Sequence, residues 1–124
     1  MEVRASAQQV RMSPRKVQLI VEAIRGLRAS EALAQLQFRP QAAAHVVYKV
    51  VRSAMANAEN NYSLDPESLY VVSATADKGP GMPSRYRAKA RGQAGVIEKK
   101  TTHITIVVDN EPVMIGKRAK RVVA

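Results

Sequence analysis

The stretch that decides the fold is KGPGMPSRYRAKARGQAGVIEKK, which runs from Lys78 to Lys100. It contains seven basic residues and one acid, and four of its first six residues are glycine or proline. Strand-like sequences flank it, LYVVSATA from Leu69 to Ala76 and HITIVV from His103 to Val108. Two strands joined by a basic connection predict a long β-hairpin.

The connection is too long for an ordinary turn. Loops longer than about 15 residues are uncommon in compact domains, and they are usually functional or disordered. Small and basic residues cannot form a core of their own, and the excess of positive charge repels itself unless an anion neutralises it. Two paired arms of about 11 residues each, at ~3.3 Å per residue, reach on the order of 35 Å. We therefore predict a projecting arm that lies against a polyanion.

Basic residues alternate with other residues along the arm. Arg85, Arg87, Lys89 and Arg91 are each two positions apart. In an extended strand such residues project from the same face. The spacing therefore predicts a row of four cations that can follow a phosphate backbone. Tyr86 lies within this row, and we interpret it either as a stacking partner for a base or ribose or as a packing residue of the hairpin.

The composition also favours a polyanionic partner. The 124 residues carry a formal net charge of +10 and a pI of about 10.4, which points to nucleic acid rather than a membrane. The absence of cysteine excludes disulfides, cysteine-based zinc sites and thiol nucleophiles. Because the N-terminal segment lacks a signal-like apolar run, we expect a cytoplasmic protein with no membrane partner.

Three helices and one strand are predicted before the hairpin. Residues 2–11 alternate like a strand. The first helix begins at Ser13-Pro14 and ends at Gly26, the second spans residues 31–36 after an N-cap at Ser30, and the third runs from Pro40 to about Asn60. Apolar residues recur at helical spacing in the first and third helices: Val17, Ile20, Val21 and Ile24, then Ala43, Val46, Val47, Val50, Ala54 and Ala58.

This order of elements predicts an α+β fold. A small antiparallel three-stranded sheet packs against three helices, and a long basic β-hairpin protrudes from it. We expect residues 1–110 to form one domain, with the hairpin at about 77–100, and residues 111–124 to form a basic tail. Arg15 and Lys16 occupy the first turn of the first helix, where the helix dipole disfavours cations. An external anion would explain their position.

The sequence offers little catalytic chemistry. His45 and His103 have no acid at a recognisable spacing, and no metal-ligand spacing is present. We therefore predict no enzyme activity, no cofactor and no metal site.

Two alternatives stay open. The first is an architectural DNA-binding protein, because such proteins use basic β-arms in the minor groove and an apolar wedge such as Met82-Pro83. The second is an enzyme, which requires the two histidines to converge on an acid.

Four ordered motifs resemble a known family. They are SPRKVQLIVEAIRG at Ser13–Gly26, SAMANAENN at Ser53–Asn61, GPGMPSRYRAKARGQAG at Gly79–Gly95 and THITIVV at Thr102–Val108. Over about residues 2–108, the chain resembles the L-twenty-two family of bacterial large-subunit ribosomal proteins. It departs from the family pattern at Lys89, where arginine is usual, and at Gln93, where a basic residue is common.

The resemblance implies a structural protein that binds large-subunit rRNA (23S type), supports early subunit assembly and lines the polypeptide exit tunnel with its hairpin. The implied partners are this rRNA, neighbouring ribosomal proteins including L-four, and the nascent polypeptide. The implied tunnel-lining tip is Met82, Pro83, Ser84, Arg85 and Tyr86. The candidate RNA-binding residues are Arg11, Arg15, Lys16, Lys78, Arg85, Tyr86, Arg87, Lys89, Arg91, Lys99, Lys100 and His103.

Overall fold

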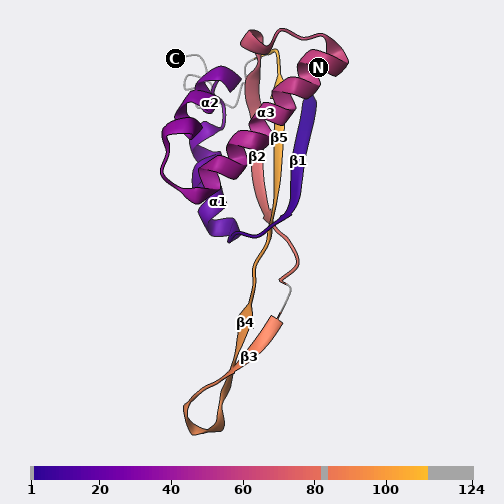
Figure 1. Ribbon diagram of the computed structural model, residues 1–124. Coiled ribbons are helices and arrows are strands. Elements are labelled where there is room, and N and C mark those ends of the chain that lie inside the picture. Colours follow the sequence, from indigo (N-terminus) through magenta and orange to yellow (C-terminus); the bar gives the residue numbers. More distant parts are fainter. Residues whose placement is uncertain (1, 82–83, 112–124) are drawn as a thin grey trace.

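The computed structural model describes residues 2–81 and 84–111, and it shows a layered body from which a two-stranded arm extends (Figure 1). The body sheet is antiparallel in the order β1-β5-β2, and the arm is a separate two-stranded sheet, β3-β4. The predicted α+β fold with a protruding hairpin is therefore confirmed. The elements are β1 (Val3–Val10), α1 (Pro14–Ile24), α2 (Ala29–Phe38), α3 (Ala42–Tyr62), the 3-10 helix η1 (Pro66–Ser68), β2 (Tyr70–Lys78), β3 (Ser84–Ala88), the 3-10 turn η2 (Ala90–Gly92), β4 (Ala94–Glu98) and β5 (Thr102–Asp109).

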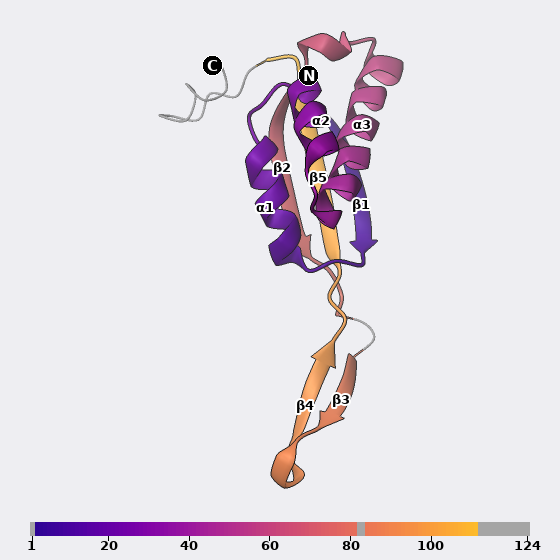
Figure 2. The same ribbon diagram turned by 60° about the vertical axis from the view of Figure 1, so that its left-hand side comes forward.

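Strand β5 lies at the centre of the sheet, and its alternation decides which face is covered. Its even-numbered residues from 102 to 108 are buried, whereas the odd-numbered residues from 103 to 107 are half-buried on the opposite face. Ile106 lies between Ala5 and Ala74 of the neighbouring strands. Because these neighbours are small, α3 can pack closely over the large side chains of β5. Figure 2 shows α1 and α3 on the same face of the sheet, with α1 beside β2.

Helix α1 follows the sequence pattern closely. Ser13 is an extended N-cap and Pro14 is the first helical residue, although the Ser13 side chain makes no capping hydrogen bond. Gly26 follows the helix with a φ of 85°, a conformation that favours glycine. The predicted apolar stripe is confirmed, because its four residues are fully buried: Val17, Ile20, Val21 and Ile24.

The predicted starts of the other two helices are wrong. Helix α2 begins at Ala29 after Arg28, so Ser30 lies inside the helix and is not its N-cap. A tertiary contact fixes this start, because Ala29 is buried and its N–H donates to the Leu69 carbonyl at 2.9 Å. Helix α3 begins after Gln41 rather than at Pro40.

Helix α3 buries a wider surface than a single stripe. Ala44 and Val51 are fully buried in addition to the predicted residues, whereas Val46 is only half-buried. The helix contacts α1 and α2 as well as strands β1 and β5. Contacts on several sides explain why its buried arc is broader than the sequence periodicity indicates.

The outer edge of β2 is covered by the segment that follows α1. Val71 exchanges backbone hydrogen bonds with residues 26–27, at 2.9 and 2.8 Å. Further along the strand, Arg25 donates from Nε and Nη2 to the Ala74 carbonyl, at 3.2 and 2.6 Å. Open strand edges invite pairing with other chains, so these contacts satisfy an edge that the sheet itself leaves unpaired.

Replacing Arg25 with methionine should lower the free energy of unfolding by about 1 kcal/mol, because the Ala74 carbonyl loses both side-chain donors. Urea denaturation followed by circular dichroism measures the change. Arg15→Met is the matched control, because Arg15 is exposed on α1 and its side chain has no hydrogen bond or ion pair in the described part of the chain. Equal reductions in stability in the two variants would contradict the role given to Arg25.

A short joint connects the arm to the sheet. The Gly79 N–H donates to the Thr101 carbonyl at 2.9 Å, and the Thr101 hydroxyl donates to the Pro80 carbonyl at 2.7 Å. Thr101 is buried, and its side chain and the His103 ring occupy the space where a larger residue in place of Gly79 would put its side chain. The joint is thus hydrogen-bonded and closely packed, and it holds the arm as an extension of the sheet.

Candidate nucleic-acid interface

The arm presents one basic face and one face without basic residues in β3 and β4. In the register of β3 and β4, Arg85 and Arg87 oppose aliphatic or small residues, whereas Tyr86 opposes Val96. Opposite residues of an antiparallel pair share a face. The two arginines therefore lie on one side of the arm, and Tyr86 and Val96 lie on the other. Tyr86 is 80% exposed and Val96 is 63% exposed.

The predicted row of four cations is wrong at its far end. Strand β3 ends one residue before Lys89, and the Lys89 N–H donates to the Gln93 carbonyl at 2.6 Å across the turn. Arg91 has a φ of 61°, so it lies outside the extended conformation and leaves the row. The aliphatic stem of Lys89 lies beside Gly95, which is opposite Arg87. Three cations therefore share the basic face, and Arg91 lies at the end of the arm.

The residues predicted as the tip of the arm have a different position. Met82 and Pro83 lie outside the described residues. Residues Ser84–Tyr86 form the beginning of β3 and pair with the end of β4, in the part of the arm nearer the body. The chain reverses at Ala90–Gly92. The outermost point of the arm is therefore the turn, and Ser84–Tyr86 lie along its side.

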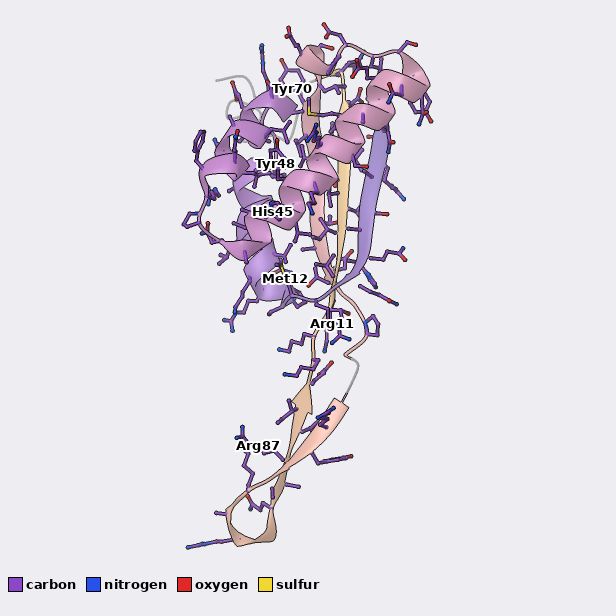
Figure 3. The ribbon with its side chains drawn as sticks, in the orientation of Figure 1. Arg11, Met12, His45, Tyr48, Tyr70 and Arg87 are labelled. Carbon is purple, nitrogen blue, oxygen red and sulfur yellow. The ribbon has the colours of Figure 1, made fainter. Side chains whose placement is uncertain are left out.

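A groove of about 1040 Å³ lies where the arm joins the body. Its lining comes from the loop before α1, the first turns of α1 and α3, and the residues that connect β4 to β5. Figure 3 shows Arg11 and Met12 at this junction, and Arg87 farther out on the arm. Four predicted RNA-binding residues from distant parts of the sequence meet in the groove: Arg11, Lys16, Lys99 and Lys100.

The protein does not neutralise the cations of this groove. Glu98 is the one acid among its lining residues, and its carboxylate contacts Lys78 Nζ at 3.4 Å. Over residues 2–81 and 84–111, none of the four groove cations forms an ion pair. An exposed pair such as Lys78–Glu98 adds little stability, but it places a positive partner beside the groove's single negative charge. The groove therefore has a net positive charge.

The other predicted RNA-binding residues are spread more widely. Arg15 is exposed on α1 but is not part of the groove lining. His103 has a structural contact, because its Nδ1 accepts the Gln9 N–H at 3.1 Å. Gln9 has a φ of 56° at the irregularity in β1, so this hydrogen bond supports an unusual backbone conformation. An RNA contact by His103 stays a prediction.

The two histidines lie on opposite sides of the sheet. His103 belongs to the residues of β5 that point away from the helices, whereas His45 is exposed on α3 (Figure 3). The groove beside His45 has no acid among its lining residues. In the part of the chain that the structure describes, no group of three His, Cys, Asp or Glu side chains could hold a metal ion. The condition for the enzyme alternative, histidines converging on an acid, is therefore not met.

Sequence reasoning missed the apolar part of the groove. Met12, Leu19 and Ala42 lie among the cations in its lining. Leu19 is 66% exposed, although the apolar stripe of the same helix is fully buried. The available signal was that Leu19 falls on the polar face of an amphipathic helix, where an apolar side chain has no core to pack against.

None of the helices in the described residues combines the length and apolar character that crossing a membrane requires. A layered α+β body carries an arm with a basic face and a basic groove at the root of that arm, and such basic surfaces are typical of the class of proteins that bind nucleic acid.

Comparison with known proteins gives the family. Residues 5–109 match the family described as ribosomal protein L22p/L17e. The large ribosomal subunit protein uL22 of Halothermothrix orenii is 51% identical over 111 residues, covering 90% of this chain and 97% of the relative. Its counterparts in Clostridium novyi and Latilactobacillus sakei are each 50% identical, covering 87% and 86% of this chain and 96% and 91% of the relatives. The chain belongs to the ribosomal protein L22p/L17e family, whose members are structural ribosomal proteins and not enzymes.

The family match ends at residue 109, which is also the last residue of β5. The predicted basic tail begins beyond this point, and residues 112–124 of that tail lie outside the described residues.

Proposed function

We propose that this protein is a structural constituent of the large ribosomal subunit that binds large-subunit rRNA in the cytoplasm. In this role it supports early subunit assembly, and its arm lines the polypeptide exit tunnel beside the ribosomal protein L-four and the nascent chain. The relatives named large ribosomal subunit protein support this assignment over almost the whole described chain.

The basic face of the arm carries the proposal. Arg85, Arg87 and Lys89 share this face, and in the described residues none of them has an acidic partner. Cations that bind phosphates release condensed counterions, and this release drives association with nucleic acid. Contacts to phosphates also fix the register of a protein on its RNA. The arm thereby allows RNA segments that would repel one another to approach.

The face of the arm without basic residues suits the tunnel. Tyr86 and Val96 are exposed and lie opposite one another, away from Arg85 and Arg87. An arm with this arrangement can hold RNA on one side and present a surface without cations on the other. A peptide in transit would meet few fixed charges on that side.

A salt series of binding tests the proposal with the full-length protein, a large-subunit rRNA and duplex DNA of equal length. We expect tighter binding to the rRNA at every salt concentration. In the double variant Arg85→Gln and Arg87→Gln, the slope of log K against log salt should fall by about 0.7 to 0.9 for each phosphate that the arm no longer neutralises.

The double variant Lys49→Gln and Arg52→Gln is the matched control. It removes the same charge from exposed positions on α3, outside both the arm and the groove. We expect its slope to equal that of the unmodified protein. Equal affinity for DNA and rRNA would instead favour an architectural DNA-binding protein, and equal slopes in the two variants would contradict the role of the arm.

A further inference from the structure

The groove at the root of the arm combines two chemically different surfaces. Arg11, Lys16 and Lys99 supply positive charge from three separate segments, and Leu19 and Met12 supply apolar surface between them. Its volume of about 1040 Å³ lies just above the ~300–1,000 Å³ typical of sites for small organic groups.

Hydrogen bonds within the body join the loop before α1 to the segment between β4 and β5, and both of these segments line the groove. The Thr102 hydroxyl is fully buried and donates to the Met12 carbonyl at 2.7 Å. The Met12 N–H in turn donates to the Val10 carbonyl at 2.8 Å. These bonds link the loop that carries Arg11 to the start of β5, two residues after Lys100. The backbone positions of Arg11 and Lys100 are therefore fixed relative to one another before any ligand binds.

This combination selects among possible ligands. A phosphate of an RNA duplex would use the cations but would leave Leu19 exposed to water. A paired base cannot cover Leu19 either, because its faces are stacked within the helix. An unpaired base has a free face and carries its own phosphate, and proteins recognise such bases through apolar and stacking contacts beside positive charge.

We propose that this groove binds one unpaired RNA nucleotide, with its base against Leu19, Met12 and Ala42 and its phosphates against the surrounding cations. The inference rests on the proposed rRNA binding and adds a site at which one nucleotide leaves its stack. The arm then holds RNA along its length, and the groove fixes a single point at its root.

The experiment fills the groove without changing its charge. Ala42 is an exposed groove residue at the first position of α3, so Ala42→Trp places a bulky side chain there. Ala34→Trp is the matched control, because Ala34 is exposed on α2 outside the groove. Binding of each full-length variant is measured with a short oligoadenylate and with an RNA duplex of the same length.

We expect Ala42→Trp to weaken binding of the oligoadenylate about tenfold, within the range for removing one enclosed base from its site, and to change duplex binding less than about twofold. Ala34→Trp should change neither affinity. Leu19→Ser serves as a second, smaller perturbation and should act in the same direction, and circular dichroism establishes that each variant is folded.

Two outcomes would overturn the inference. If both groove variants leave oligoadenylate binding unchanged, the groove holds no base. If they weaken the oligoadenylate and the duplex equally, the groove binds phosphate alone. Either result is separate from a failure of the proposed function, which would appear as loss of the preference for rRNA over DNA in the unmodified protein.

Discussion

Replacing residues 85–97 with an Asn-Gly turn should weaken binding to large-subunit rRNA roughly a hundredfold or more at physiological salt, because every cation with which the arm binds phosphate is removed at once. Ser84 and Glu98 are paired across the two strands, so a two-residue turn can join them. The exchange removes four cations and keeps the joint with its Lys78–Glu98 ion pair. Filter binding or fluorescence anisotropy measures the affinity.

The body should stay folded in this variant. Residues 85–97 contribute nothing to the hydrophobic core, so the midpoint of urea unfolding should remain that of the full-length protein. A full-length chain with the four arm cations changed to glutamine separates the effect of the arm's charge on rRNA affinity from the effect of its length and shape. If the neutral arm binds rRNA as weakly as the shortened chain, charge accounts for the arm's contribution. Unchanged affinity in the shortened chain would contradict the arm as an rRNA-binding element.

Replacing Ile106 with alanine should lower the free energy of unfolding by about 4 kcal/mol, at the upper part of the range for buried isoleucine. Ile106 is fully buried in the central strand, and its neighbours on both adjacent strands are Ala5 and Ala74. These small residues cannot extend into the space left behind. A reduction of this size is a large share of the ~5–15 kcal/mol that stabilises a typical domain.

Thr105→Ala is the control for this substitution. Thr105 is the preceding residue on the same strand, but it lies half-buried on the face away from the helices. We expect its free energy of unfolding to fall by about 1 kcal/mol or less, because the change leaves no cavity in the core under the helices. Urea denaturation followed by circular dichroism compares the two variants. Similar reductions in the free energy of unfolding would contradict a sheet whose core-forming face is the one covered by the helices.

Residues with strong periodicity allowed much of the fold to be predicted. The stripe of α1, the alternation of residues 2–11 and the basic connection between strands each depend on neighbours in the sequence. The helix starts near Ser30 and Pro40 could not be placed in the same way. Ala29 begins α2 because it is buried and hydrogen-bonded to Leu69, a contact between distant segments that local propensity does not encode.

The candidate site was predictable only in part. The cations of the arm could be predicted from composition. Because basic residues alternate without interruption from Arg85 to Arg91, the sequence pattern gave no sign of the turn at Ala90–Gly92. Lys89 and Arg91 fit the spacing of a strand, whereas the turn places Arg91 at a φ of 61° and Gly92 at 73°. The groove could not be predicted at all, because Lys16 and Lys99 meet only through the topology of the sheet. Leu19 indicates an apolar binding surface because the structure shows its side chain exposed in the groove lining.

The joint at the root of the arm has a mechanical consequence. One strand of the arm, β4, continues through Lys99–Thr101 directly into β5, the central strand of the body. A pull along the arm therefore acts lengthwise on β5 and, through β3, on β2, while the hydrogen bonds that join β5 to β1 run across that direction. Bonds loaded in shear share the force and must rupture together rather than unzip one after another. Traction on the far end of the arm is therefore carried into the body by the ladder of bonds between β5 and β1.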